Sequence, residues 1–446
     1  MHLTASEVAS ATGGQLSGPD VDVDGASIDS RTIGAGNLFV PVVAERDGHD
    51  FIQGALDKGA VAYLTEREPL PGTTAIRVAD TQKALADLGR HARSRIDGPV
   101  VGVTGSVGKT STKDLLAAVL STTFVTAANE RSFNNELGLP LTLLNAPDDT
   151  QAAVVEMGAR GIGHIALLCD IAHPSVGVVT RVAGVHLELF GSIDDVAQAK
   201  GELIESLPSD GLAVLNADDP RVIAMASRSS APVISYGIDS SGAIDEPADV
   251  YATDITVGDD LRAAFTLHTP WGQTPVALSA RGAHQVSNAL AAAAVAGGLG
   301  VGIDAIAAGL GAGQVSALRM ELVTTPGGTT VINDAYNANP TSMKAALDAL
   351  ASLPATGRRV AVLGVMAELG ADGAAEHAQI AADAAQRGIE VIAVDCDAYG
   401  AQVTHVADID GALAALGELT AADAVLVKGS RVAALERVAA ALLGAQ

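Results

Sequence analysis

The chain has 446 residues, a length typical of roughly three domains, and its 48% hydrophobic and 18% charged residues exclude a protein disordered throughout. Lys and Arg total 27 against 52 Asp and Glu, and the resulting net charge of −25 disfavours binding to duplex nucleic acid or an anionic membrane. The two cysteines, Cys169 and Cys396, are too few for a disulfide scaffold or a cysteine-rich zinc site. No export signal is recognised, and the longest uncharged apolar run, 289–303, is too short to cross a bilayer. We therefore expect a soluble, cytoplasmic α/β protein.

The first segment, residues 1–98, is predicted to form a small α/β domain. Short β-like runs at 37–43 and 60–64 are separated by Gly and Asp turns, and a helix is predicted over 82–95. The Asp-Gly-Pro triplet at 97–99 should end this helix, because Gly and Pro together disfavour helical backbone. The first domain boundary is therefore placed after residue 98.

The second segment, residues 99–317, alternates buried strands with helices. Apolar runs at 100–104, 152–156 and 176–180 are typical of strands buried on both faces of a parallel sheet. A glycine-rich turn follows the first run and opens a helix. Its glycines let backbone N–H groups surround a phosphate, and the helix N-terminus adds positive potential. The turn consists of Gly105, Ser106, Val107, Gly108, Lys109, Thr110 and Ser111.

Two side chains of this turn suit a nucleoside triphosphate. Lys109 can reach the outer phosphates, and the Thr110 hydroxyl can bind Mg²⁺. ATP binding is the favoured interpretation because a buried strand precedes the turn and a helix follows it. The alternative is a tight strand-to-helix turn with a solvated lysine.

Strand ends later in the segment carry candidate metal ligands. Glu156 ends the run at 152–156, at the sheet edge where open α/β sheets bind ligands, although it could also be an exposed strand-end acid. His186 follows the run at 176–180 and could equally be a hydrogen-bonded structural histidine.

The helix predicted over 192–207 has a lysine on its apolar face. Its apolar residues recur at spacings of three and four, and Lys200 lies among them. A buried ammonium is costly unless it is paired or chemically altered. The alternative is a lysine that packs its stem and extends its charged end to water. Periodicity does not decide between the two.

The third segment, residues 318–446, again alternates strands and helices. Strands are predicted at 329–333, 359–363, 390–395 and 424–427, with helices beginning near 341, 374, 408 and 431. Strands that alternate with helices indicate βαβ crossovers, and therefore a second, Rossmann-like doubly wound sheet.

Four sets of motifs carry a resemblance to a known family. They are Ile-Asp-Ser-Arg at 28–31 with the stretches 37–40 and 47–51, the loop 133–140, the stretch 282–288, and Asn-Asp-Ala-Tyr-Asn-Ala-Asn-Pro at 333–340. On these motifs the whole chain resembles the Mur ligase family, ATP-dependent amide-forming enzymes of peptidoglycan precursor synthesis, a pathway that underlies cell shape and division. The last motif is similar to that of members that join D-alanyl-D-alanine to UDP-N-acetylmuramoyl-tripeptide through an acyl phosphate.

The resemblance implies a UDP-binding N-terminal domain, a central ATP-binding domain and a C-terminal Rossmann-like domain, in a monomer with two bound Mg²⁺ ions. It implies that Lys109, Glu156, His186 and a carbamylated Lys200 serve catalysis. The implied metal ligands are Thr110, Glu156, His186 and Lys200. The implied nucleotide contacts outside the glycine-rich turn are Asn288, Arg319 and Asp334. The implied substrate contacts are Ser30, Arg31, Asn134, Asn135, Tyr336, Asn337 and Asn339.

Two other functions remain open on the sequence. One is a family member that adds a single amino acid, either the diamino-acid-adding enzyme or a folylpolyglutamate synthase. The other is a regulatory P-loop ATPase, which the inward Lys200 and the uridine-type N-terminal motifs disfavour. Nothing in the sequence singles out a general base, or decides whether the tripeptide ends in meso-diaminopimelate or lysine.

Overall fold

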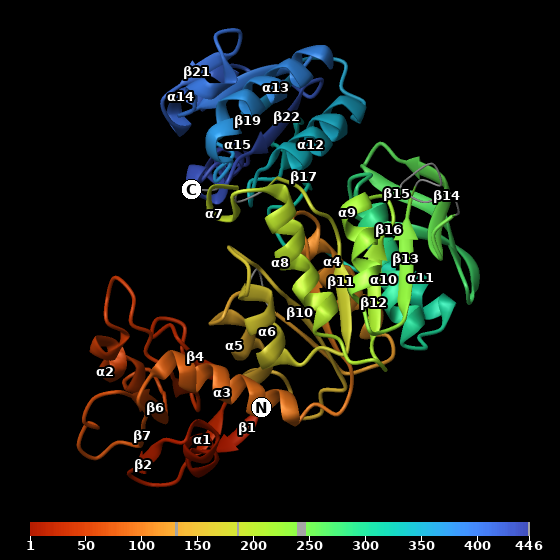
Figure 1. Ribbon diagram of the computed structural model, residues 1–446. Coiled ribbons are helices and arrows are strands. Elements are labelled where there is room, and N and C mark those ends of the chain that lie inside the picture. Colours follow the sequence, from red (N-terminus) through yellow and green to blue (C-terminus); the bar gives the residue numbers. More distant parts are fainter. Residues whose placement is uncertain (130–132, 185–186, 239–246, 445–446) are drawn as a thin grey trace.

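A computed structural model of the chain describes residues 1–129, 133–184, 187–238 and 247–444. Its three main sheets have five, nine and six strands and follow one another along the chain. Figure 1 shows the N-terminal sheet at one end of the molecule, the nine-stranded sheet in the middle and the C-terminal sheet at the other end. The predicted α/β architecture with parallel sheets is confirmed.

The N-terminal part combines short strands with three helices. Its elements are β1 His2–Thr4, α1 Ala5–Thr12, β2 Gln15–Ser17, β3 Asp22–Asp24, β4 Ala26–Ser27, β5 Leu38–Phe39, α2 Ile52–Leu56, β6 Ala62–Thr65, β7 Ala75–Arg77 and α3 Thr81–Ser94. The strand order is β2-β7-β6-β5-β4, with only β2 antiparallel to its neighbour. The run predicted at 37–43 yields only the two residues of β5, since Pro41 has no N–H to continue the ladder.

The central part is built on the nine-stranded sheet. Its strands are β8 Val100–Thr104, β9 Thr126–Ala128, β10 Ala152–Glu156, β11 Val176–Val179, β12 Leu212–Asn216, β13 Val233–Gly237, β14 Val250–Val257, β15 Arg262–Thr269 and β16 Gly272–Arg281. Its helices are α4 Lys109–Leu120, α5 Gly138–Leu144, α6 His164–Ala172, α7 Leu187–Phe190, α8 Ile193–Glu205, α9 Pro220–Ile223, α10 Gln285–Gly298 and α11 Ile303–Ala312.

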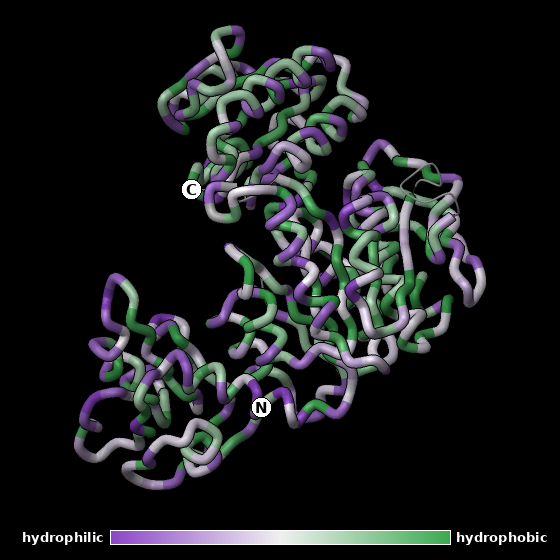
Figure 2. The backbone as a smooth tube through the Cα atoms, viewed as in Figure 1, coloured by the Kyte–Doolittle hydropathy of each residue, from purple (hydrophilic) through white to green (hydrophobic). Residues whose placement is uncertain are grey.

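Helices cover both faces of the parallel strands. One core joins α4, α10 and α11 to β8 and the antiparallel strands, and the opposite face packs against α5, α6 and α8. The strand order is β16-β15-β14-β13-β12-β11-β8-β10-β9, so β8 lies between two parallel neighbours and its carboxyl end faces a topological switch point. The middle strands are mostly green in Figure 2, in keeping with burial on both faces.

The central sheet also has strands beyond the parallel ones predicted at 100–104, 152–156 and 176–180. β14, β15 and β16 form an antiparallel extension that pairs with β13 along one edge. Antiparallel strands can expose one face, so their apolar residues alternate with polar ones and form no continuous apolar run. The burial of β15 alternates in this way, which explains why no strand was predicted there.

Helix α11 packs closely against α4, the helix that follows the glycine-rich turn. A β-carbon added at Gly309 in α11 would lie 2.5 Å from the Cα of Val119 in α4. We expect Gly309→Ala to lower the free energy of unfolding by about 1–3 kcal/mol, because overpacking outweighs the gain in helix propensity. Urea denaturation is the measurement. Gly54→Ala in α2, where nothing lies within 4 Å of the new methyl group, is the control and should not lose stability; a similar result for both variants would contradict the close packing.

The C-terminal part is the second doubly wound sheet. Its strands are β17 Glu321–Thr324, β18 Thr330–Asn333, β19 Arg359–Leu363, β20 Glu390–Val394, β21 Thr404–Val406 and β22 Ala424–Lys428, and its helices are α12 Pro340–Ser352, α13 Gly373–Gln386, α14 Ile409–Leu416 and α15 Glu436–Leu442. The order is β17-β18-β22-β19-β20-β21, parallel except for β17. Separate cores lie on its two faces, one with α12 and α13 and the other with α14 and α15.

One helix start in this part was predicted wrongly. The helix expected from Arg431 is a single 3₁₀ turn, Arg431–Ala433, and α15 begins only at Glu436. Ala434 adopts a φ of +48°, which interrupts helical backbone between the two. Within the described ranges, none of the helices combines the length and apolar composition needed to cross a bilayer.

Candidate active site

The glycine-rich turn forms at the carboxyl end of β8. Gly105 and Gly108 have φ values of +146° and +89°, and a β-carbon at Gly105 would collide with the Thr180 hydroxyl. The ammonium of Lys109 donates to the carbonyl oxygen of Gly105 at 2.7 Å, which folds the side chain back over the turn. Burial lowers the pKa of Lys109, and Arg319 lowers it further, while Glu156 opposes the shift.

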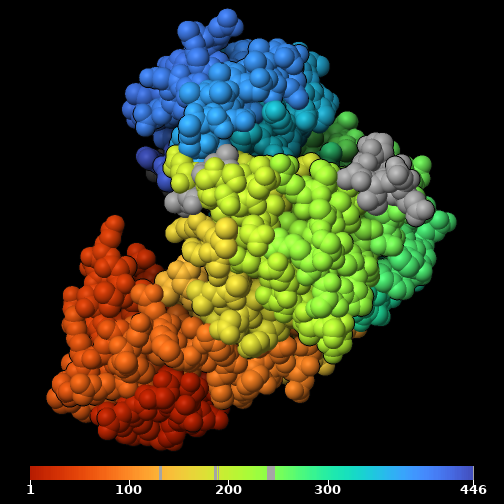
Figure 3. Space-filling model, viewed as in Figure 1, coloured from red at the N-terminus to blue at the C-terminus, as the bar shows by residue number. Residues whose placement is uncertain are grey.

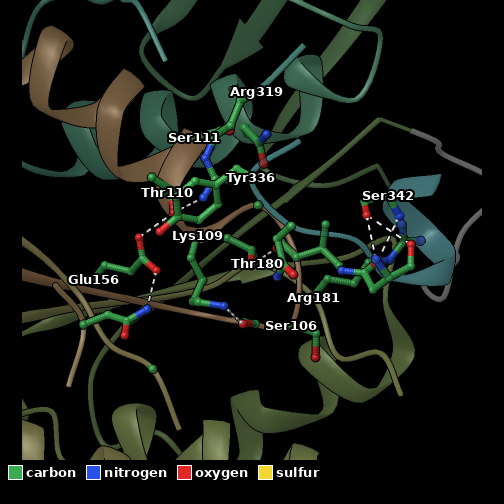
Figure 4. A pocket seen from close by; sticks show the side chains of 18 of the residues that line it. Ser106, Lys109, Thr110, Ser111, Glu156, Thr180, Arg181, Arg319, Tyr336 and Ser342 are labelled. Carbon is green, nitrogen blue, oxygen red and sulfur yellow. Dashed lines mark hydrogen bonds between the residues drawn. The ribbon is translucent and has the colours of Figure 1, made fainter. Parts of the chain in front are cut away.

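Glu156 lies at the end of β10 beside this turn. It is 1% exposed. Its two carboxylate oxygens accept hydrogen bonds at 2.7 Å, one from the Thr110 hydroxyl and the other from the Asn134 side-chain amide (Figure 4). Its backbone N–H donates to the side-chain oxygen of Asn129 at 3.0 Å. The strand end and the loop after β9 therefore hold the carboxylate against the phosphate-binding turn.

Arg319 reaches the same place from the segment between the central and C-terminal sheets. Its Nη2 donates to the Thr110 hydroxyl at 2.9 Å, and its guanidinium lies 4.4 Å from the centre of the Tyr336 ring (Figure 4). Its Nε is buried and has no hydrogen-bond partner among the residues that the structure describes. An anionic ligand at the turn would therefore face a cation from the C-terminal side.

Two side-chain amides, those of Gln285 and Asn288, lie at the start of α10. The side-chain oxygen of Asn288 accepts from the Thr112 hydroxyl at 3.2 Å, and its amide nitrogen donates to the Gln285 side-chain oxygen at 2.8 Å. The Gln285 side-chain nitrogen is buried, and no described residue forms a hydrogen bond with it. A ligand with an acceptor atom would satisfy it.

Lys200 points inward, as one of its two sequence interpretations required. The residue is 3% exposed, so only a small part of its surface is accessible. No described residue is within hydrogen-bond or ion-pair distance of its ammonium. Burial lowers its pKa well below the ordinary value, and the Lys109 charge lowers it further. The structure therefore favours a neutral amine, which is the form that reacts with carbon dioxide.

These groups share one cavity of about 800 Å³ between the sheets. Figure 3 shows a broad hollow between the N-terminal and C-terminal parts, with the central part along its right side. Of the residues predicted for the site, those that line the cavity are Gly105, Ser106, Val107, Gly108, Lys109, Thr110, Ser111, Asn134, Asn135, Glu156, Lys200, Asn288, Arg319, Asp334, Tyr336, Asn337 and Asn339.

Two of these residues also have a local structural role. The side-chain oxygen of Asn339 accepts from the Ser342 N–H at 2.9 Å and caps α12. The side-chain oxygen of Asn135 accepts from the Gly138 N–H at 2.9 Å at the start of α5. The loops that bring Asn339 and Asn135 to the cavity wall are therefore the same loops that lead into α12 and α5.

Three predicted residues are not brought to the cavity wall by the described structure. Ser30 and Arg31 do not line it, although Ile28 nearby does. The Arg31 side chain is 84% exposed and pairs with Asp29 at 2.8 Å, which lowers the pKa of that carboxyl to about 2. His186 lies outside the described residues.

Oxygen ligands, rather than a histidine or cysteine cluster, are available for a metal ion. Within the residues described, no three His, Cys, Asp or Glu side chains are grouped closely enough to hold one. The Thr110 hydroxyl and Glu156 carboxylate are hard oxygen donors beside a phosphate-binding turn. Mg²⁺ characteristically uses one or two such ligands together with phosphate oxygens and water, so this donor set fits Mg²⁺.

Sequence reasoning missed several polar residues of the cavity. Arg181 and Asn216 follow or end β11 and β12, and His284 precedes α10. The rule that ligands gather at the carboxyl ends of parallel strands would have pointed to the first two. His284 lies within the motif at 282–288, but its charged neighbours come from distant parts of the sequence and meet it only in the fold. There burial, with Lys428 and Arg319, lowers its pKa, while Asp334 opposes the shift.

Three family models match successive segments of the chain. They are described as "Mur ligase family, catalytic domain" over residues 22–93, "Mur ligase middle domain" over 103–296 and "Mur ligase, glutamate ligase domain" over 318–431. A relative from Mycobacterium tuberculosis (strain CDC 1551 / Oshkosh) is 40% identical, and the match covers 99% of this chain and 98% of that protein. It is named UDP-N-acetylmuramoyl-tripeptide--D-alanyl-D-alanine ligase.

Solved structures give the same result over the whole fold. A crystal structure of MurF from Acinetobacter baumannii has a TM-score of 0.89 and 30% identity, and covers 100% of this chain and 99% of that chain. A MurF ligase from Thermotoga maritima in complex with ADP has a TM-score of 0.82 and 28% identity, over 95% of this chain and 98% of that chain.

Proposed function

The chain belongs to the Mur ligase family, and on that premise we propose that it joins D-alanyl-D-alanine to UDP-N-acetylmuramoyl-tripeptide. ATP is consumed, and UDP-N-acetylmuramoyl-pentapeptide, ADP and phosphate are formed, in peptidoglycan precursor synthesis. We assign residues 1–98 to UDP-substrate binding, 99–317 to ATP binding and 318–446 to the Rossmann-like ligase domain. The full-length likeness to ligases with this name supports the assignment.

One geometric observation in this chain is the main support for the proposal. Lys109, Glu156 and Arg319 meet at one phosphate-binding turn, and Lys200 lines the same cavity. A carboxylate and a triphosphate are both anions, so their approach is opposed by charge. Cations and backbone N–H groups fixed at the turn offset that charge as it shifts in the transition state. This arrangement suits a reaction in which one anion attacks another.

The first step is an attack by the terminal carboxylate of the tripeptide on the γ-phosphorus of ATP. A carboxylate oxygen bonds to phosphorus, the bond to the β-phosphate oxygen breaks, and ADP leaves with that electron pair. Lys109 and the turn amides hold the phosphates, and Arg319 covers them from the C-terminal side. In the second step the dipeptide amine attacks the acyl carbon, loses a proton, and displaces inorganic phosphate to leave the new amide.

Thr110 and Glu156 would hold Mg²⁺, and by resemblance His186 and a carbamylated Lys200 would complete two metal sites. Mg²⁺ supplies charge neutralisation at the phosphate oxygens when it is bound. A carbamate forms when the neutral Lys200 amine bonds to the carbon of carbon dioxide and releases a proton. This modification places a buried anion close to Lys109, which accounts for an inward lysine that lacks a described partner.

The proposal is tested by identifying the product. Purified protein supplied with ATP, UDP-N-acetylmuramoyl-tripeptide and D-alanyl-D-alanine should form the pentapeptide and release one phosphate for each product molecule, as measured by mass spectrometry and phosphate release. With D-alanine, glutamate or meso-diaminopimelate in place of the dipeptide, the rate should fall by about 100-fold or more. Comparable turnover with a single amino acid, or without any acceptor, would overturn the proposal in favour of another ligase or a regulatory ATPase.

A further inference from the structure

Lys428 is a buried lysine with no role in the mechanism above. It ends β22, the strand between β18 and β19 in the C-terminal sheet, and is 1% exposed. Its ammonium lies 2.5 Å from a carboxylate oxygen of Asp334 and donates to the carbonyl oxygen of Asn337 at 2.9 Å. A buried charge persists only with partners of this kind, so Lys428 and the loop at 334–337 depend on each other.

The other oxygen of Asp334 holds the segment that enters the C-terminal sheet. It accepts the backbone N–H of Met320 at 3.1 Å, and the N–H of Tyr336 donates to the carbonyl oxygen of Leu318 at 3.2 Å. Leu318 and Met320 have φ values of +62° and +52°, a backbone region that side-chain-bearing residues rarely adopt. The loop therefore holds two unfavourable conformations in place, one on each side of Arg319.

These two conformations determine where Arg319 points. Its guanidinium crosses from the C-terminal side to the Thr110 hydroxyl, and it packs on Tyr336, which belongs to the same loop. A chain of contacts thus runs from Lys428 through Asp334 and Met320 to Arg319. The Lys428 ammonium donates hydrogen bonds to the loop at 334–337 and not to the phosphate-binding turn.

We propose that Lys428 is a positioning residue for Arg319, acting through Asp334 to hold the 318–320 segment so that the guanidinium meets the nucleotide phosphates. The inference rests on the proposed function, because it takes Arg319 to act on ATP. Without Lys428, the Asp334 carboxylate would lose its counter-ion, and the segment would relax from its positive-φ conformation.

The test is a double-mutant cycle on kcat/KM for ATP, with wild type, Lys428→Met, Arg319→Met and the combination. Each single variant should lose about 100-fold, because a small displacement of a group that touches the transition state costs that much. The combination should lose no more than Arg319→Met alone, since residues that act as a unit are not additive. The KM for D-alanyl-D-alanine should change much less than the ATP parameters. Lys344→Met on α12, which removes a 3.6 Å ion pair with Asp383 on α13, is the matched control and should be unchanged.

Each outcome decides a different claim. Multiplicative losses would overturn the positioning role and point instead to direct phosphate contact by Lys428. An Arg319→Met variant with unchanged kcat/KM for ATP would count against the proposed function itself. Hydrogen exchange supplies a second readout, and it uses Lys428→Gln in case Lys428→Met fails to fold, because the glutamine amide can still donate hydrogen bonds. In this variant, faster exchange should be confined to amides near 318–320 and 334–337. Unchanged exchange there, or faster exchange throughout the C-terminal sheet, would contradict the inference.

Discussion

Replacement of Lys200 by alanine is expected to lower kcat by about 1,000-fold or more, with the protein still folded. Lys200 is buried without a described partner, and its lowered pKa favours the neutral amine that carbamylation requires. The loss follows from removing a charged group that acts on the transition state rather than on substrate binding alone. Steady-state phosphate release measures it. Lys83→Ala, which removes an exposed lysine paired with Asp87 on α3, is the matched control and should leave kcat unchanged.

A rescue experiment separates chemistry from packing. Acetate or propionate added to Lys200→Ala should restore part of the activity, because the small carboxylate can occupy the space left by the carbamate. Wild-type protein prepared with ¹³C-labelled bicarbonate should show a carbamate carbon in its NMR spectrum, and the alanine variant should not. Unchanged activity in Lys200→Ala would mean that the lysine only fills space.

Glu156→Gln is expected to lower kcat by about 100- to 1,000-fold and to raise the Mg²⁺ concentration needed for half-maximal activity. The amide has the same shape, but it loses the negative charge that faces the Thr110 hydroxyl and Lys109. One of its atoms also becomes a donor, which conflicts with the hydrogen bond from either Thr110 or Asn134. Initial rates measured over a range of Mg²⁺ concentrations provide the test.

A surface glutamate supplies the control for this variant. Glu205 on α8 pairs with Arg228 and has a side chain that is 48% exposed, so Glu205→Gln should keep both the rate and the Mg²⁺ dependence of wild type. A Glu156→Gln variant with an unaltered Mg²⁺ requirement would exclude this carboxylate from metal binding.

Much of the fold could be predicted because parallel strands buried on both faces leave continuous apolar runs. The runs at 100–104 and 152–156 match β8 and β10 residue for residue. The antiparallel extension was missed because strands with one exposed face leave only alternating, weaker signals. The inward face of α8 was predicted correctly from its period, but the period left open whether Lys200 packs inward or extends to water, and only the fold decides this.

The candidate site was predictable only in part. Glycine spacing and strand ends locate Lys109 and Glu156, since both signals are local. Contacts between Arg319 and Thr110, or between Lys428 and Asp334, join residues 209 and 94 positions apart, and no local pattern encodes them. Leu318 and Met320 likewise have positive φ values, which are unfavourable for residues with side chains, and only the fold explains how this backbone is held.

Transfer of an oxygen atom from substrate to phosphate tests the central claim most directly. The tripeptide is labelled with ¹⁸O in its terminal carboxylate and converted with ATP and D-alanyl-D-alanine, and the released phosphate is analysed by mass spectrometry. Attack of that carboxylate on the γ-phosphorus predicts one ¹⁸O atom in each phosphate released from doubly labelled substrate. Phosphate without the label, formed together with the pentapeptide, would contradict direct attack by one anion on the other.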